Sequence, residues 1–355
     1  MKITLTLSLL LFSWTLYADT VVYVSERGDK KIAVYSLDEE SGELTRKSEV
    51  ILEGSPGALC SSGDAKYLYA AVRSPNEFIT FSVESKTGAL TQMAQAPAAG
   101  GAAYLFPDHT GQWALAAYYG DGKVSVSRMD GGVIIGPPVQ VLDVGLKAHC
   151  IQTSPDNRFA FTPHTGDLNC VDQFAFNSTS GFLSRNSPGN LAGVDGGGPR
   201  HMQFHPNGKW VYLVNEQGRS VTHCLYDAKK GTLTRRETLS TLPEDWTEPK
   251  GSCADIEISV DGKFLYASNR GHDSVAMFRI DADSGALTSL GQAPTGKTPR
   301  SFNIIPGGER FLVSAGQADD SLTVYSRDGE TGMLTQLHQI EGGSGPGWVQ
   351  GMKLP

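Results

Sequence analysis

Short alternating runs of apolar and polar residues recur along the chain, and each follows a turn rich in glycine, aspartate or asparagine. Clear examples begin at residues 63, 154, 205, 259 and 306, where the chain reads GDAKYLYA, SPDNRFAFT, HPNGKWVYLV, SVDGKFLYAS and PGGERFLVS. Alternation with a period of two gives a strand one apolar face, and turns of this composition join antiparallel strands. The pattern therefore predicts many short strands joined by hairpins and no long helices.

A second phrase recurs between these strands and sets the period of the repeat. It reads SGELT at 41, TGALT at 87, DGGVI at 130, SGFLS at 180, KGTLT at 230, SGALT at 284 and TGMLT at 331, the third copy being degenerate. Its glycines are 46, 44, 49, 50, 54 and 47 residues apart. A repeat of this length that holds four antiparallel strands is typical of a propeller blade. The sequence therefore predicts an all-β fold, a seven-bladed β-propeller.

The two ends of the repeat predict how the ring closes. The first segment, VVYVSERGDKKIAVYSL from residue 21, has no turn-and-strand unit before it, whereas the last, GPGWVQGMKLP, supplies a strand after the seventh glycine. We expect this C-terminal strand to complete the first blade, which removes two exposed strand edges. Residues 19–355 would then form a single propeller domain, with two separate β domains as the alternative.

The first 18 residues have the composition of an export signal. Lys2 precedes a mostly apolar, uncharged stretch over residues 3–16, and Ala18 precedes the polar Asp19. We predict a signal peptide over residues 1–18 and an exported protein, periplasmic or secreted. A buried first strand and an uncleaved anchor are the alternatives. No later segment has the roughly 18 consecutive apolar residues that a spanning helix needs, so we expect no membrane span.

Composition narrows the choice of partners and cofactors. The 355 residues carry a formal net charge of −8 and no run of Lys or Arg, which argues against nucleic acid as a partner. Five cysteines, an odd number, leave at least one thiol unpaired even where one disulfide forms. They lack zinc-site spacing, and the chain has no HExxH, GxSxG or Walker-type motif. We predict no metal, no other cofactor and a monomer.

Equivalent positions in successive blades should lie at one level around the central axis, so the repeat indicates which polar side chains converge. One set follows the second strand of each repeat: Arg27, Arg73, Tyr119, Thr165, Glu216, Arg270 and Gln317. A second set precedes the inner strand: Gly57, His149, Arg200, Ala254 and Arg300. The sequence leaves open whether the two sets meet at one mouth or lie at opposite ends of the channel.

Five arginines at these positions are unusual for an acidic protein. Converging guanidinium groups favour binding of a carboxylate or phosphate, although each arginine could instead clasp loop carbonyls or an acidic residue of the next blade. His149 is a candidate general base, since its ordinary pKa lies near neutrality and nearby arginines would lower it. Glu216 beside Arg270 should stay ionised, as a base, an orienting group or a salt-bridge partner. His201 and Asp255 are their neighbours.

Three segments carry a resemblance to a known family: GPRHMQFHPNGKWVYLVNE (198–216), DGKFLYASNRGHDSVAMFRID (261–281) and GKTPRSFNIIPGGERFLVS (296–314). The chain resembles the seven-bladed propeller lactonases, which include bacterial 6-phosphogluconolactonase and fungal carboxymuconate lactonizing enzyme. The resemblance implies an active site in the central cleft. Carried over by motif, its catalytic residues are His149, Arg200, Glu216 and Arg270. The repeat adds, as expected substrate-binding residues, Arg27, Arg73, His201, Asp255 and Arg300.

The leading hypothesis is hydrolysis of a small anionic or sugar-type lactone, with His149 as the base for water. Arg200 and Arg270 would hold the anionic group and the developing oxyanion, and Glu216 would fix the arginines or the histidine. KAHC stands where the family often has PHxH, and Asp255 replaces the glutamate of an AEI segment. Because an export signal does not suit a cytoplasmic sugar-phosphate enzyme, we expect an unphosphorylated or otherwise exported substrate. A muconate-type cycloisomerase and a non-catalytic binding propeller remain the alternatives.

Overall fold

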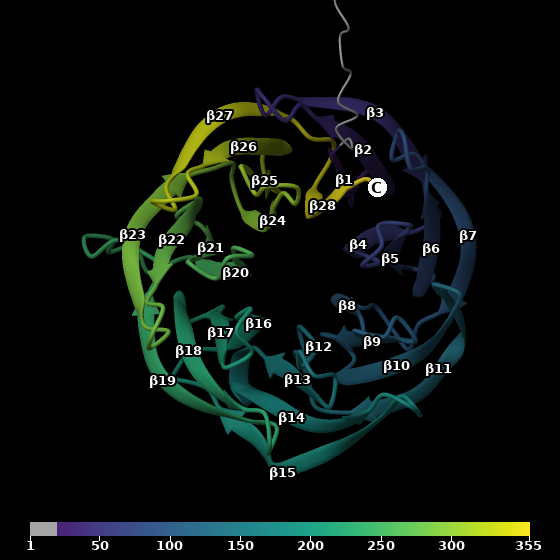
Figure 1. Cartoon of the computed structure of the whole chain (residues 1–355), viewed down its shortest axis with the longest axis vertical. Helices are drawn as coiled ribbons and strands as arrows, with labels where there is room; N and C mark the ends of the chain where they lie inside the picture. Colours follow the sequence, from purple (N-terminus) through teal and green to yellow (C-terminus); the bar gives the residue numbers. More distant parts are fainter. Residues whose placement is uncertain (1–19) are drawn as a thin grey trace, which may run out of the picture.

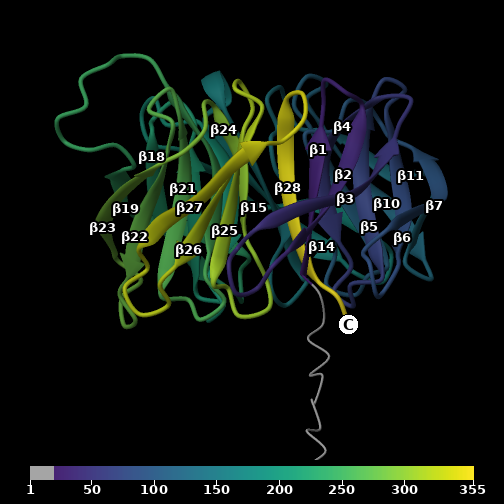
Figure 2. The same cartoon turned by 90° about the horizontal axis from the view of Figure 1, so that it is seen from above.

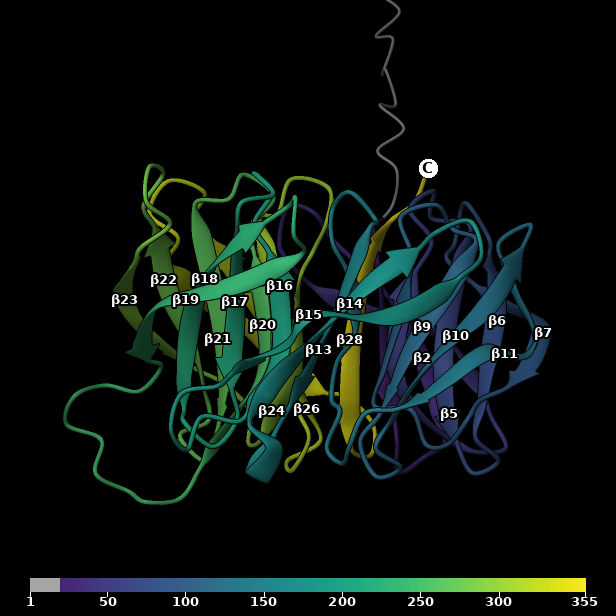
Figure 3. The same ribbon diagram turned by 90° about the horizontal axis from the view of Figure 1, so that it is seen from below.

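The computed structural model describes residues 20–355, so the predicted signal peptide lies outside the described residues. Residues 20–355 form seven four-stranded antiparallel sheets arranged as blades around a central axis (Figure 1). The predicted seven-bladed all-β propeller is therefore confirmed. Seen from the side, the blades stand next to one another in a disc (Figures 2 and 3). No helix in this part of the chain is long and apolar enough to cross a bilayer.

Each blade runs from an innermost strand at the axis to an outermost strand at the rim. Blade 1 contains, in this order, β28 (Pro346–Lys353), β1 (Thr20–Glu26), β2 (Lys31–Leu37) and β3 (Leu44–Ile51). Blade 2 contains β4 (Ser55–Ser61), β5 (Tyr67–Arg73), β6 (Glu77–Val83) and β7 (Leu90–Pro97). Blade 3 contains β8 (Tyr104–Pro107), β9 (Trp113–Tyr118), β10 (Lys123–Asp130) and β11 (Val133–Asp143).

The remaining four blades repeat this order. Blade 4 contains β12 (Gln152–Thr153), β13 (Phe159–His164), β14 (Cys170–Asn177) and β15 (Phe182–Ala192), with the short 3-10 helix η1 (Gly166–Leu168) before β14. Blade 5 contains β16 (Pro199–Phe204), β17 (Trp210–Asn215), β18 (Ser220–Asp227) and β19 (Thr232–Ser240). Blade 6 contains β20 (Ser252–Ile258), β21 (Phe264–Arg270), β22 (Ser274–Ile280) and β23 (Leu287–Pro294). Blade 7 contains β24 (Pro299–Ile304), β25 (Phe311–Gly316), β26 (Ser321–Arg327) and β27 (Leu334–Glu341).

The recurring glycine lies in the turn between the third and fourth strands of every blade. All seven turn glycines have a positive φ, between +66° and +85°, which is the left-handed region that glycine enters without steric cost. A Cβ there would also meet a large side chain of the neighbouring blade, Trp113 in the case of Gly181 and Phe159 in the case of Gly231. Backbone conformation and close packing together explain why the phrase keeps its glycine.

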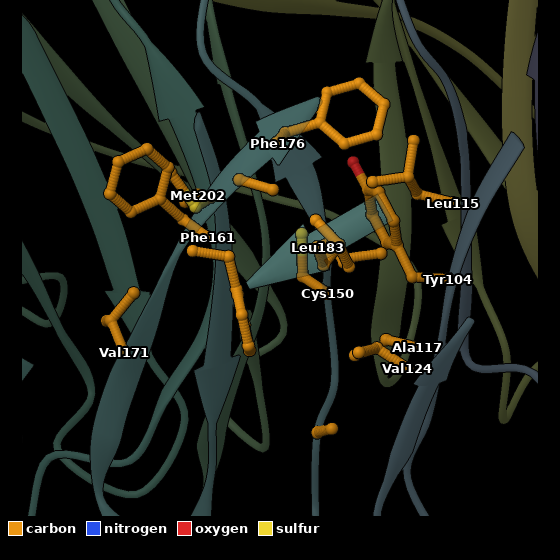
Figure 4. Packing of buried hydrophobic residues seen from close by; sticks show 14 of the residues in the cluster. Tyr104, Leu115, Ala117, Val124, Cys150, Phe161, Val171, Phe176, Leu183 and Met202 are labelled. Atoms are coloured by element: carbon orange, nitrogen blue, oxygen red, sulfur yellow. The ribbon is translucent and has the colours of Figure 1, made fainter. Parts of the chain in front are cut away.

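Apolar cores fill the interfaces between successive blades. Figure 4 shows part of the largest cluster, to which blade 3 contributes Leu115 and Ala117 and blade 4 contributes Phe161 and Val171. Burial of each such phenylalanine or leucine contributes about 1.5–3 kcal/mol relative to leaving it exposed. The interfaces are also linked by tyrosine hydroxyls, since Tyr212 donates a hydrogen bond of 2.7 Å to the carbonyl of a turn glycine in the next blade. The blades thus form one continuous ring.

The chain ends close the ring in the predicted way. Strand β28 pairs antiparallel with β1 from Thr20 opposite Lys353 to Glu26 opposite Pro346, so the last strand of the chain becomes the innermost strand of blade 1. The five cysteines are all free, and Cys150, Cys224 and Cys253 are buried. Closure therefore depends on strand pairing and apolar packing, and the one disulfide that the sequence left open does not form.

Candidate active site

Antiparallel pairing brings the two predicted sets of polar positions together. The start of each innermost strand lies beside the end of the second strand, as in the pairs Pro199 with Asn215 and Ser252 with Arg270. Arginines that precede the innermost strand therefore lie near arginines that follow the second strand. The question that the sequence left open is settled in favour of a single mouth of the channel.

The structure gathers five of the predicted site residues around one small pocket at this mouth. We call it the arginine pocket; its lining comprises Arg27, Arg73, His149, Arg200 and Arg300 together with Gly57, Ala58, Ala103, Gly347 and Trp348. Its volume of about 20 Å³ is enough for a water molecule and for little more. Glycine at 347 leaves room for the Arg27 side chain, which a Cβ there would push aside.

Backbone carbonyls occupy only part of the hydrogen-bonding capacity of these arginines. Arg200 donates to the carbonyl of Ala254, and Arg73 Nε donates to the carbonyl of Ala102 across 3.4 Å. Among residues 20–355, Arg27 and Arg300 make no side-chain hydrogen bond, and no carboxylate lies within ion-pair distance of Arg27, Arg73 or Arg300. The alternative that each arginine clasps loop carbonyls or an acidic residue therefore holds for Arg73 and Arg200 but not for Arg27 and Arg300.

Glu216 joins the other two arginines of the set. Its Oε1 lies 3.0 Å from Arg270 Nη2, and its Oε2 lies 3.3 Å from Arg200 Nε. Arg200 is 2% exposed, so this pair is shielded from bulk water. Glu216 and Arg270 do not line the arginine pocket and instead lie beside it. The glutamate therefore holds the two guanidinium groups in fixed positions relative to each other.

The arginine pocket is strongly cationic. Burial lowers the pKa of Arg300 to about 9, and repulsion from Arg200, Arg27, Arg270 and Arg73 adds to this effect. Burial lowers the pKa of Arg200 to about 10, against the opposing attraction of Glu216. An anion in the pocket would offset the repulsion between these groups, and guanidinium groups offer paired donors that suit carboxylate and phosphate oxygens.

His149 enters this pocket as a buried, neutral imidazole. Burial holds its pKa well below the ordinary value, and the charges of Arg200, His201 and Arg300 lower it further. Its Nδ1 is buried and has no hydrogen-bond partner within the described chain. The ring packs edge-on against Tyr119 and His201, with centroids 5.4 Å and 5.0 Å away. A neutral histidine can accept a proton, and a bound anion would raise its pKa toward the working range.

His201 and Asp255 lie behind the pocket. His201 Nδ1 is 2.7 Å from Asp255 Oδ1, and the imidazole packs against Tyr104 and Trp348. Neither His201 nor Asp255 lines the arginine pocket; Asp255 lines a larger pocket further along the channel. These two predicted substrate-binding residues therefore lie outside the arginine pocket, and their role in binding substrate stays a prediction.

Trp348 and Tyr104 are site residues that the sequence reasoning missed. Their ring centroids are 5.6 Å apart, and Trp348 lines both pockets of the channel. A signal was available, because GPGWVQ near the C-terminus aligns with GPRHMQ at 198 and places Trp348 at the position of His201. We call Trp348, which lines both pockets, and Tyr104, which packs against it in the larger one, the aromatic floor.

Comparison with known proteins agrees with this fold. A candidate 6-phosphogluconolactonase from Bacteroides fragilis superposes with a TM-score of 0.85 and 26% identity, covering 95% of this chain and 99% of that one. A candidate 6-phosphogluconolactonase from Bacteroides uniformis gives 0.84 and 26%, covering 94% and 100%. The periplasmic gluconolactonase of Pseudomonas aeruginosa gives 0.84 and 24%, covering 95% and 99%. The family model described as lactonase, 7-bladed beta-propeller, matches residues 17–350. The chain therefore belongs to the lactonase family of seven-bladed β-propellers.

Proposed function

We propose that this protein is an exported lactonase that hydrolyses a small anionic or sugar-type lactone at the mouth of the channel, where the arginine pocket receives the reacting end of the substrate. One observation carries the proposal: three guanidinium groups without a carboxylate partner, those of Arg27, Arg73 and Arg300, share a small pocket with neutral His149. Unpaired, partly buried cations beside a potential base favour an anionic substrate that reacts with water.

The chemistry is proposed from these positions. His149 removes a proton from water while the water oxygen attacks the lactone carbonyl carbon, and Arg200, which lines the pocket, stabilises the negative charge on the carbonyl oxygen, with Arg270 held beside it. The ring C–O bond then breaks, and the imidazolium returns its proton to the departing alkoxide oxygen. The product is a hydroxy acid whose carboxylate remains near the arginines. Glu216 keeps the two arginines aligned through its ion pairs.

Within the class of lactone substrates, the main open question is whether the substrate carries a phosphate group. The structural relatives include candidate 6-phosphogluconolactonases and a periplasmic gluconolactonase. The predicted export signal favours a lactone without phosphate, because sugar phosphates arise in the cytoplasm. We therefore expect an aldonolactone such as a gluconolactone to react faster than its phosphorylated form.

The test is pH-stat hydrolysis of a lactone panel, with and without phosphate, by protein purified from residue 19. His149→Ala and Arg270→Ala should each lower turnover by about two orders of magnitude or more. The matched control is His338→Ala, whose imidazole lies on the surface and bonds the carbonyl of Ser41. Turnover like wild type in His149→Ala would refute the role of this base.

A silent panel would point to the other two hypotheses. Lactone formation from a muconate-like dicarboxylate without uptake of water would identify a cycloisomerase. Tight binding of a lactone or sugar acid without turnover would identify a binding propeller. Either outcome would leave the anion-binding role of the arginine pocket in place and remove the hydrolytic one.

A further inference from the structure

The central channel contains a second and larger pocket beyond the aromatic floor. Its volume is about 260 Å³, more than ten times that of the arginine pocket, about 20 Å³. Residues from the innermost strands of all seven blades line it, and Trp348 is shared by the two pockets. A pocket of this size can enclose much of a small molecule.

The repeat itself defines the polar lining of this pocket. Three residues after the position occupied by His149, Arg200 and Arg300, the seven blades carry Gln350, Cys60, Phe106, Gln152, Gln203, Glu257 and Asn303, and all seven line the pocket. Four of these side chains are amides and one is a carboxyl group. We call this set the amide ring. No lysine or arginine lines the pocket, in contrast to the mouth.

Several polar atoms of the amide ring are not used within the described protein. Gln152 donates to Tyr104 Oη across 2.7 Å and Gln350 donates to the carbonyl of Gly351 across 2.9 Å, which leaves the side-chain oxygens of both free. Gln203 makes no side-chain hydrogen bond within residues 20–355 and is not sealed from solvent. The pocket therefore offers two acceptors and one complete amide to a ligand.

The charge of this pocket is low. Burial and the nearby Asp255 raise the pKa of Glu257 to about 8, so this carboxyl group is mostly protonated at neutral pH. Its oxygens accept bonds of 2.6 Å from Asn303 Nδ2 and from the backbone amide of Ile304, and a protonated oxygen can still donate. Burial alone would raise the pKa of Asp255, but His201 and Arg200 lower it, so Asp255 supplies one carboxylate charge to the lining, hydrogen-bonded to His201. An anion finds no cation here, and uncharged donors and acceptors predominate.

We propose that the amide ring binds a neutral polyhydroxylated ligand, a monosaccharide or a polyol, at a site separate from the arginine pocket. Hydroxyl groups both donate and accept, which matches the free amide of Gln203 and the free oxygens of Gln152 and Gln350. The aromatic rings of Tyr104, Phe106 and Trp348 supply apolar surface for the C–H faces of such a ligand. The proposal is independent of whether the arginine pocket hydrolyses a lactone.

The experiment is calorimetric titration of the full chain with D-glucose and D-glucitol. D-gluconate tests whether the pocket prefers an anion, and Ca²⁺ tests whether it prefers a cation. We expect the neutral probes to bind in the millimolar range or tighter. Gln203→Leu should weaken this binding by about tenfold or more, because ligand hydroxyls would lose both amide partners. Arg300→Leu, on the other side of the floor, should leave glucose and glucitol binding unchanged.

Tryptophan fluorescence gives a second measurement that does not depend on the Gln203→Leu variant. Saturable change on addition of glucose or glucitol, lost in Trp348→Phe while calorimetric binding persists, would place the ligand beside the floor. Equal affinity in the wild type and Gln203→Leu, preference for gluconate or Ca²⁺, or absence of binding up to about 50 mM would overturn the proposal.

Discussion

The guanidinium groups of Arg27, Arg73 and Arg300 lie in the same small pocket without a carboxylate within ion-pair distance in the described chain. Desolvation and mutual repulsion both disfavour their charged forms, as the lowered pKa of Arg300, about 9, indicates. Such an arrangement costs folding stability unless an anion binds. At the scale of single residues, these arginines therefore lower the folding stability and at the same time favour the binding of an anion.

Replacement of one of these arginines should separate its cost in folding stability from its contribution to anion binding. Arg300→Leu removes a repulsive charge and keeps an apolar stem, so we expect its free energy of unfolding to rise by about 1 kcal/mol. Sulfate should raise the thermal midpoint of the wild type by mass action and raise that of the variant less. Arg236→Leu, at an exposed position of β19, is the matched control and should change stability by less than about 0.5 kcal/mol. A lower midpoint for Arg300→Leu would contradict the argument.

The buried histidines make stability depend on pH in a defined direction. Burial lowers the pKa of His201 to about 4 and holds that of His149 well below its ordinary value. Between pH 6.5 and 4 the unfolded chain therefore binds protons that the folded chain does not. The stabilisation is complete above about pH 6.5 and is lost as the pH falls through this window.

Urea unfolding between pH 7.5 and 5 measures this dependence. We expect the free energy of unfolding to fall by a few kcal/mol over this range in the wild type and by less in His201→Gln. The surface variant His338→Gln should follow the wild type. Identical slopes for wild type and His201→Gln would show that this histidine does not stay neutral in the folded chain.

The sequence predicted at which height along the central axis the pocket residues lie, but it did not predict the direction of every side chain. Equal offsets in equal blades were sufficient to bring Arg27, Arg73 and Arg300 together, because each blade repeats the same backbone path. The register of the innermost strand shifts between Pro199 and His201, and such an irregularity re-aims the following side chains. A bulge has no signature in the alternation of residues, so the position of His201 behind the pocket could not be predicted.

At the scale of strands and turns, the physical requirements of the repeat were visible because they recur seven times. The turn glycine is needed in every blade for its positive φ and for contact with the neighbouring blade. The innermost strands of blades 3 and 4, β8 and β12, are only 4 and 2 residues long. Irregular backbone therefore replaces most of the strand pairing next to the axis in these two blades.

Two glycines with the same φ distinguish the requirement for a left-handed backbone from the requirement for close packing against the next blade. Gly231 and Gly208 both have φ of +66°, but a Cβ at Gly231 would collide with the Phe159 ring, whereas a Cβ at Gly208 would meet no atom within 4 Å. Gly208→Ala should cost about 1 kcal/mol for the left-handed backbone. Gly231→Ala should cost about 1–3 kcal/mol more, because the core between blades 4 and 5 is overpacked. Equal losses in urea unfolding would show that packing across the blades contributes nothing at this turn.

At the scale of the whole molecule, the propeller depends on one strand that comes from the far end of the chain. Strand β28 pairs with β1, and its residue Trp348 forms part of the floor between the two pockets. Without this strand, β1 would present an unpaired edge to the channel, which is a site for aggregation. Closure of the ring and integrity of both pockets are therefore coupled.

Deletion of residues 346–355 should test that coupling. We expect the truncated chain to aggregate or to unfold at a lower temperature, because blade 1 loses its innermost strand and the ring opens. A synthetic peptide of residues 346–355 added in trans should pair with β1 and restore the thermal midpoint, as strand addition does elsewhere. The same peptide with Val349→Asp should fail, since Val349 is 2% exposed and packs in an apolar core. A truncated chain that keeps the wild-type midpoint without peptide would mean that six complete blades and one of three strands are sufficient for the fold.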